Sequence, residues 1–97
     1  MKIRPYSPFV TEKFKRSWRG WIRSSEGFEV RIMGRNDLEY RDAACHLHMF
    51  VEPMANYADI VLDRASVPDT AELPRAELVQ RLRRAFTARG WNLLYDE

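Results

Sequence analysis

The sequence contains a single cysteine, Cys45, among its 97 residues. One thiol excludes an internal disulfide and a four-cysteine zinc site, and it fits a reducing compartment. Long apolar runs are also missing, since no window approaches the roughly 20 apolar residues of a membrane span. The first residues, MKIRPYSPFV, place prolines and an arginine where a signal peptide needs a continuous apolar stretch. We therefore expect a cytoplasmic protein without a membrane partner.

Glycine and proline are scarce, with four and five residues respectively. Hydrophobic residues (45%) and charged residues (31%) occur in the proportions of an ordinary globular domain, which excludes a disordered or low-complexity chain. We expect a single domain over residues 1–97, because a chain of this length has room for one core. Such a domain buries roughly two-thirds of the surface that its unfolded chain exposes. A deep active site would take a large share of that core, which favours a binding protein over an enzyme.

The net charge is small, +2, but it is distributed unevenly. Residues 1–24 contain seven Lys and Arg side chains and one Glu, a balance of +6, so the rest of the chain carries −4. Four aromatic residues are interleaved with these cations: Phe9, Phe14, Trp18 and Trp21. This combination can bind phosphates and stack on bases, so a nucleic-acid-binding or regulatory role is the alternative function. Against it, the shared strand parity of Trp18 and Ile22 predicts that both belong to the core.

The order of the elements predicts an α+β fold. Pro5 and Pro8 predict an irregular basic lead-in over residues 1–17. Alternating apolar residues, with turn signals roughly every 8 to 12 residues, predict an antiparallel meander of about five strands over 18–63, in sequence order. An amphipathic helix is expected over 74–89, with Pro74 in its first turn, and a last strand over 91–95.

One face of the expected antiparallel sheet should pack against the helix. The parity of each strand and the helical spacing select the residues of this core. They are Phe28, Val30, Ile32, Leu38, Tyr40, Leu47, Met49, Ile60, Leu62, Leu78, Leu82, Phe86 and Trp91.

The segment CHLHMFVE contains an H-x-H pair, His46 and His48. Side chains two apart on a strand point the same way at ~7 Å, so both imidazoles could face one metal ion. A third donor would have to come from Glu52, Asp42 or Asp59, and only if strand pairing brings one of them close. We expect solvent-facing histidines and neither a metal nor another cofactor.

A histidine-dependent nuclease is the least implausible enzyme for this sequence. It would place His46 and His48 around a phosphate with Arg41 as the nearby cation. No motif with catalytic spacing accompanies these residues, so the sequence predicts a protein that is not an enzyme.

Acidic residues gather in two places, around one hairpin and before the helix. Such a surface attracts a partner with a basic cleft, for example a nuclease, and two aromatic side chains could serve as anchors. The predicted partner-binding residues are Asp37, Glu39, Asp42, Phe50, Tyr57, Asp59 and Asp63.

Three groups of residues carry a resemblance to a known class of proteins. They are Trp18, Gly20, Trp21 and Ile22, then Val30, Gly34, Arg35, Leu38, Glu39, Tyr40 and Arg41, then Ala85, Phe86, Gly90 and Trp91 around the end of an amphipathic helix. In size, texture and element order, most of the chain resembles the small bacterial immunity proteins of contact-dependent growth inhibition and related polymorphic toxin systems. The resemblance implies a cytoplasmic, non-enzymatic protein that binds one cognate toxin domain and blocks its active cleft. The resemblance assigns no functional role to any individual residue of this chain.

Overall fold

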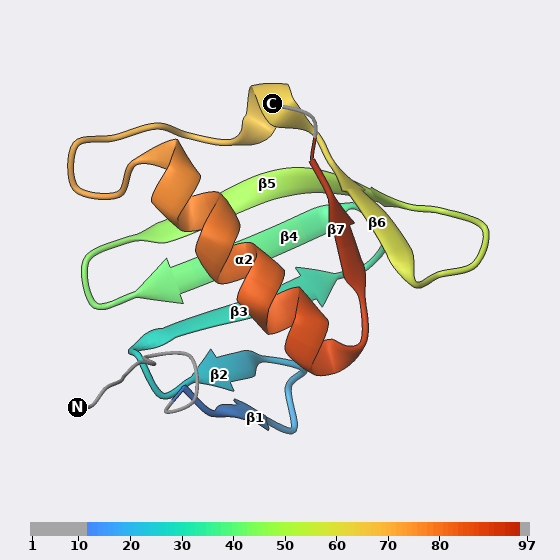
Figure 1. Cartoon of the computed structure of the whole chain (residues 1–97), viewed down its shortest axis with the longest axis horizontal. Helices are drawn as coiled ribbons and strands as arrows, with labels where there is room; N and C mark the ends of the chain where they lie inside the picture. Colours follow the sequence, from blue (N-terminus) through green and yellow to red (C-terminus); the bar gives the residue numbers. More distant parts are fainter. Residues whose placement is uncertain (1–11, 96–97) are drawn as a thin grey trace, which may run out of the picture.

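The computed structural model describes residues 12–95, which form a curled sheet of seven strands with one helix packed against it (Figure 1). The elements are β1 (Phe14–Arg16), β2 (Ile22–Ser24), β3 (Phe28–Met33), β4 (Asp37–Asp42), β5 (His46–Pro53), β6 (Asp59–Leu62), the 3-10 turn η2 (Arg64–Ser66), α2 (Arg75–Arg89) and β7 (Asn92–Leu94). The predicted α+β class is confirmed. No helix within 12–95 is long and apolar enough to cross a membrane.

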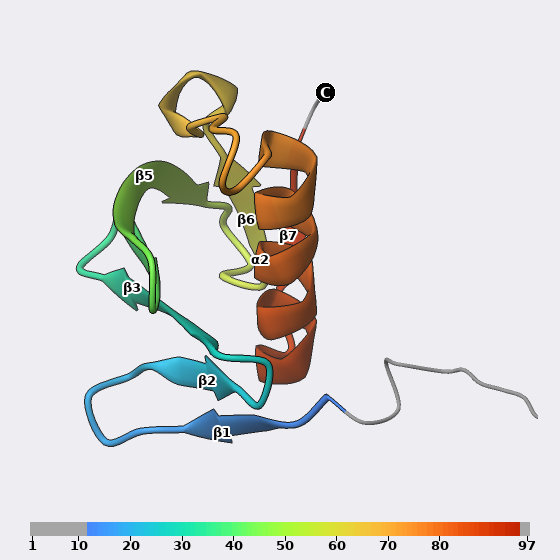
Figure 2. The same ribbon diagram turned by 90° about the vertical axis from the view of Figure 1, so that its left-hand side faces the viewer.

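The strands lie side by side in sequence order, as expected, and β1 to β6 are antiparallel neighbours. The last strand differs from the predicted antiparallel sheet, because β7 pairs with β6 in parallel and makes the sheet mixed. The reason is the connection: α2 carries the chain back along the sheet before β7 begins, as crossover connections between parallel strands do. Figure 2 shows the sheet curling around this helix.

β1 lies inside the lead-in that the prolines predicted to be irregular, and for these residues the prediction was wrong. Phe14 packs edge-on against Phe28, with ring centroids 6.3 Å apart, and the strand pairs with β2. A three-residue strand of this kind is stabilised by its neighbours rather than by its own pattern, so periodicity does not reveal it. The rest of the lead-in, residues 1–11, lies outside the described residues.

The core lies between the inner face of the sheet and α2. Ten of the predicted core residues are buried, from Phe28 on β3 to Phe86 on α2, whereas Ile32, Leu47 and Trp91 form a half-buried rim. Trp18 contradicts the prediction, since it is 86% exposed. The chain makes a tight turn here, in which Ser17 Oγ accepts the backbone N–H groups of Arg19 and Trp21, so strand parity does not apply.

The helix begins one residue after the predicted start, at Arg75, and ends at Arg89 as predicted. Gly90 follows with φ of 86°, a left-handed conformation that glycine adopts without a steric penalty. The Trp91 N–H donates to the Phe86 carbonyl at 2.8 Å and the Gly90 N–H to Thr87 at 3.0 Å, which ends the helix in a Schellman motif. This turn sends the chain directly into β7.

Candidate functional site

The face of the sheet that is turned away from α2, here called the outer face, carries alternating charges. Glu29 lies opposite Arg41 and Arg31 opposite Glu39 across β3 and β4. On the next pair of strands, Glu39 lies opposite His48 and Arg41 opposite His46. Opposite charges directly across antiparallel strands stabilise a sheet. The register of β3 and β4 therefore places each glutamate of this face opposite an arginine.

Trp21, directly before β2, is a buried residue of the outer face, with 3% of its surface exposed. The Arg31 and Arg41 guanidinium carbons lie 4.2 and 4.0 Å from the centroid of its ring, as in cation–π contacts. A carboxylate holds each arginine in turn: Arg31 Nε donates to Glu39 Oε1 at 2.7 Å and Arg41 Nε to Glu29 Oε2 at 2.6 Å. The tryptophan and its two ion pairs therefore form one packed polar layer.

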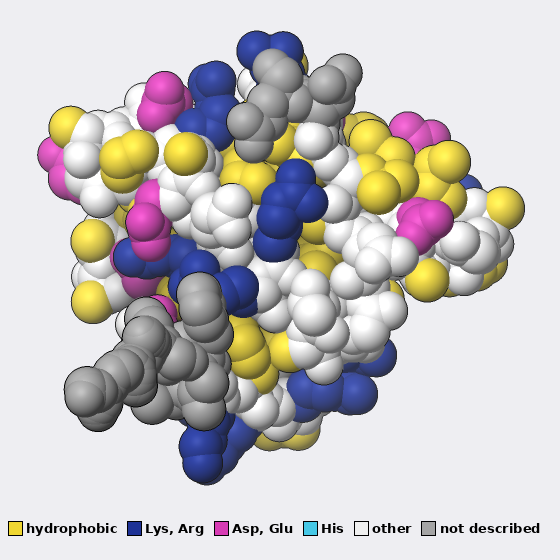
Figure 3. All heavy atoms as spheres, viewed as in Figure 1, with side chains coloured by type: hydrophobic (Ala, Val, Ile, Leu, Met, Phe, Trp, Pro, Cys, Tyr) yellow, Lys and Arg dark blue, Asp and Glu magenta, His cyan; other side chains and the backbone are white. Residues whose placement is uncertain are grey.

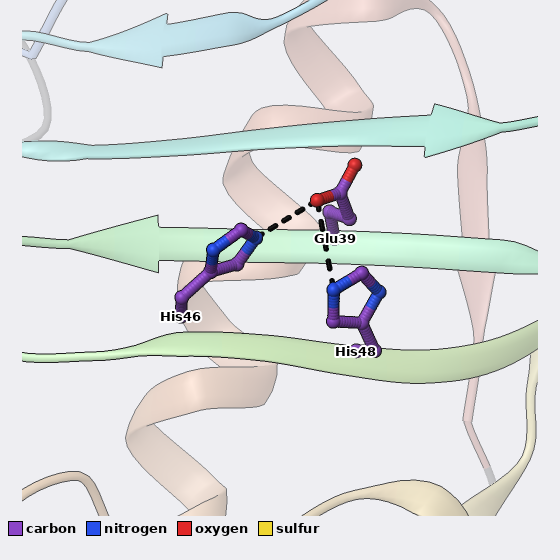
Figure 4. A group of neighbouring side chains, drawn as sticks. All are labelled: Glu39, His46 and His48. Atoms are coloured by element: carbon purple, nitrogen blue, oxygen red, sulfur yellow. Dashed lines mark hydrogen bonds and ion pairs between the residues drawn. The ribbon is translucent and has the colours of Figure 1, made fainter.

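Glu39, His46 and His48 form a cluster next to this layer (Figure 4). Glu39 is only 5% exposed, and its Oε2 accepts a hydrogen bond from His46 Nε2 at 2.8 Å. The same oxygen lies 3.7 Å from His48 Nε2. The two imidazole rings stack with centroids 5.1 Å apart. Three side chains of types that can ligate a metal thus converge at one point of the outer face, from two adjacent strands.

Hydrogen bonds set the charges of this cluster. Burial by itself raises the pKa of Glu39, but hydrogen bonds from Arg31 and His46 lower that pKa below its ordinary value of 4.5. The hydrogen bond to Asp37, 3.0 Å from His48 Nδ1, raises the pKa of His48 above 6.5. Because a carboxylate only accepts hydrogen bonds, Nδ1 of His48 carries a proton and its Nε2 faces Glu39.

The sequence identified the histidine pair but not its third neighbour. Glu52, Asp42 and Asp59 were the candidate donors, whereas the structure brings Glu39 to the pair. Glu39 lies on β4 directly opposite His48, a position fixed by the register of the turn between β4 and β5. Counting that register from the turn at Asp42 is the one signal that could have identified it.

The acids around the β3–β4 hairpin do not form one exposed surface, contrary to expectation. Glu39 is buried in the outer face, and Asp37 is half-exposed and bonded to His48. Asp42 lies an odd number of residues from Asp37 and Glu39 on β4, so it faces the opposite side of the sheet, toward α2. There it accepts hydrogen bonds from Tyr40 Oη at 2.5 Å and from Arg81 Nη1 at 3.3 Å.

The β5–β6 loop, residues 54–58, exposes two large side chains, Tyr57 at 72% and Met54 at 46%. Tyr57 has φ of 57°, the one left-handed non-glycine residue in the described part of the chain. Asn56 Oδ1 accepts the backbone N–H groups of Ala58 and Asp59, both at 3.0 Å, and the Tyr57 N–H donates to the Met54 carbonyl. Hydrogen bonds within the loop therefore brace this conformation.

The remaining predicted partner-binding residues lie on or near the β5–β6 hairpin. Asp59 accepts from Asn92 Nδ2 at 2.8 Å and Asn56 Nδ2 at 3.1 Å, and these bonds lower the pKa of Asp59 below 3.8. Asp63 accepts the backbone N–H of Ala65 and caps η2. Phe50 is exposed on the outer face. The structure thus brings Tyr57 and Asp59 together at one loop and leaves Phe50 apart from them.

Comparisons of this chain with protein-family models, curated proteins and solved structures give no match. The outer face and the β5–β6 loop are therefore the features from which a function is inferred.

Proposed function

We propose that this protein is a non-catalytic, cytoplasmic immunity protein that binds a cognate toxin domain and blocks its active cleft. The observation that carries the proposal is the β5–β6 loop, which presents Tyr57 and Met54 to solvent on a fixed backbone. Exposed aromatic residues on a rigid support are typical anchors of protein interfaces, because little conformational entropy is lost when they become buried.

The backbone conformation of Tyr57 also supports a binding role for the β5–β6 loop. A bulky residue with positive φ costs about 1 to 3 kcal/mol, and such strain concentrates at functional positions. Asn56 and Asp59 hold the loop in this conformation, and Asn92 on β7 ties it to the sheet. A loop without a binding role would be expected to place glycine or asparagine at position 57.

The charge around the loop favours a basic partner. Residues 50–63 contain three acids, Glu52, Asp59 and Asp63, and no Lys or Arg. Figure 3 shows acidic and hydrophobic side chains side by side at the end of the molecule where the loop projects. Negative charge steers association with a positively charged cleft, which is the electrostatic character of a nuclease active site.

An immunity gene is expected to follow its toxin gene directly, so the experiment is a binding titration with an inactivated form of the protein encoded immediately upstream. The test variant is Tyr57→Gly, because glycine adopts the left-handed conformation of this residue and removes only the side chain. We expect its affinity to fall about 30-fold or more, as for an interface hot spot. The control Trp18→Ala removes another exposed aromatic from the far hairpin and should leave the affinity unchanged. Unchanged binding by Tyr57→Gly would contradict the proposal.

A second function, single-stranded nucleic-acid binding, is favoured by the β1–β2 hairpin. Trp18 is exposed at its turn, and the Arg19 guanidinium carbon lies 4.4 Å from the centroid of the Trp18 ring. Lys13, Lys15 and Arg16 are exposed on the same hairpin. This function predicts submicromolar oligonucleotide binding at physiological salt that Trp18→Ala abolishes. The immunity function predicts weak binding that salt removes.

A further inference from the structure

We propose that Glu39, His46 and His48 bind one divalent transition-metal ion, with zinc as the best match. The inference is independent of the proposed function. Imidazole nitrogen and carboxylate oxygen are ordinary zinc ligands, found at about 2.0 to 2.2 Å from the ion. One ligand atom from each of the three residues lies within 4.8 Å of the ligand atoms of the other two.

The distances between these atoms fit a common ion. Ligands in a tetrahedral zinc site lie roughly 3.3 to 3.5 Å from each other, as the bond lengths require. Glu39 Oε2 lies 2.8 Å from His46 Nε2 and 3.7 Å from His48 Nε2, on either side of that separation. The two histidines are the wider pair, within 4.8 Å at their ligand atoms, and their rings are stacked 5.1 Å apart. The imidazoles must therefore rotate out of this stacking for all three atoms to reach one ion.

The surroundings orient two of the three ligands. Asp37 accepts the Nδ1 proton of His48, which leaves the lone pair of Nε2 pointing toward Glu39 (Figure 4). A carboxylate on the far nitrogen is the usual outer partner of a zinc-binding histidine. Arg31 occupies Oε1 of Glu39 and leaves Oε2 for the metal. His46 donates Nε2–H to Glu39 in the metal-free arrangement, so Nε2 must lose this proton before it coordinates, and the neutral ring then carries its proton on Nδ1.

The support for the site is rigid. Glu39 is buried on β4, and the two histidines lie on β5 with ladder hydrogen bonds between these strands. His46 and His48 are half-exposed, so the fourth coordination position opens to solvent and is left to water. The guanidinium of Arg31, 2.7 Å from Glu39, opposes a cation electrostatically. We therefore expect weaker binding than in a four-ligand structural site.

The test is calorimetric titration of the chelator-treated, full-length protein with Zn²⁺, together with Co²⁺ absorption spectroscopy. We expect one equivalent of zinc to bind and the Co²⁺ complex to show the visible bands of four coordination. Asp37→Asn should weaken binding by about 10- to 100-fold through the orientation of His48. Glu39→Gln keeps an acceptor for Arg31, removes the anionic ligand and should weaken binding more strongly than Asp37→Asn.

The histidine variants make the assignment specific, because the chain contains no other histidine. His46→Ala and His48→Ala should each abolish the Co²⁺ bands, while circular dichroism verifies that both variants remain folded. Glu52→Gln, a change at an exposed acid on the same strand, is the matched control and should bind as the wild type does. Absence of stoichiometric zinc binding by the wild type would overturn the proposal, as would an equivalent of zinc retained in the double variant His46→Ala/His48→Ala.

Discussion

At the scale of single residues, the outer face shows how a polar surface can contain a buried aromatic. Two guanidinium groups pack on Trp21, which is not part of the main hydrophobic cluster, and Glu29 and Glu39 hold those groups in place. A charged side chain that packs its flat face on a ring excludes water and keeps its charge partly hydrated. The tryptophan thus belongs to the structure of the sheet, although it lies outside the main core.

Replacement of this tryptophan should be costly. We expect Trp21→Ala to lower the free energy of unfolding by about 3 to 5 kcal/mol, because it leaves a cavity and removes the contact of both arginines. Trp18→Ala is the matched control and should change stability by less than about 0.5 kcal/mol, as exposed positions do. Urea denaturation followed by circular dichroism measures both values. Similar stabilities of the two variants would show that Trp21 contributes no packing.

Asp42 provides a prediction about pH. Its partial burial alone would raise its pKa, but hydrogen bonds from Tyr40 Oη and from the backbone N–H groups of Ala44 and Cys45 lower it below the ordinary value of 3.8. A carboxyl whose pKa is lower in the folded state contributes stability above that ordinary value and loses it as the pH falls through the native pKa. Stability from this network should therefore be complete at neutral pH and absent in strong acid.

Unfolding measured from neutral pH to below 3.8 tests this assignment. Asp42→Asn should be less stable than the wild type at neutral pH, and the difference should shrink as the pH falls. Tyr40→Phe removes one of the donors and should reproduce part of the effect. A difference that stays constant over this pH range would contradict the role of the Asp42 charge.

At the scale of elements, the helix and the long strands were predictable because each has a complete pattern of its own. The helix was predicted to within one residue, because Pro74 and Gly90 mark its two ends. The one difference is that Pro74 is the residue before the helix and not its first residue. The strands β3 to β6 follow alternation over four to eight residues. β1 was missed because its three residues depend on pairing with β2 and on Phe14 packing against Phe28.

The contribution of α2 can be measured at its centre. Leu82 is fully buried against the sheet, so Leu82→Ala should lower the free energy of unfolding by about 2 to 5 kcal/mol. Gln80→Ala, at an exposed position of the same helix, should leave stability unchanged or slightly higher, because alanine is the better helix former. Equal effects of the two variants in thermal unfolding would mean that the helix does not complete the core.

At the scale of the whole molecule, the face on which a strand residue lies could be predicted from the sequence, whereas the register between strands could not. Which residues face the helix follows from parity within one strand, and that prediction was confirmed for ten core positions. Which residues meet across strands depends on where each turn ends, and for this reason Glu39 was not recognised as the neighbour of His48. The conformation of Tyr57 was equally hidden, because side chains of Asn56 and Asn92 from separate segments fix that loop.

Charge is also organised at this scale. The exposed cations Lys13, Lys15 and Arg16 lie on β1 and the residue before it, at one edge of the sheet, whereas acids surround the β5–β6 hairpin toward the other. A molecule with separated charges orients in the field of a charged partner, which makes productive encounters more frequent. The proposed function uses the acidic end, and the alternative function uses the basic one.

The most direct test of the proposed function is growth of cells that co-express this protein with the active, upstream-encoded toxin. We expect the wild-type chain and the Trp18→Ala variant to restore growth. Tyr57→Gly, expressed at the same level and folded, should fail to restore it because its anchor is missing. Full protection by Tyr57→Gly, or no protection by the wild type, would contradict the account.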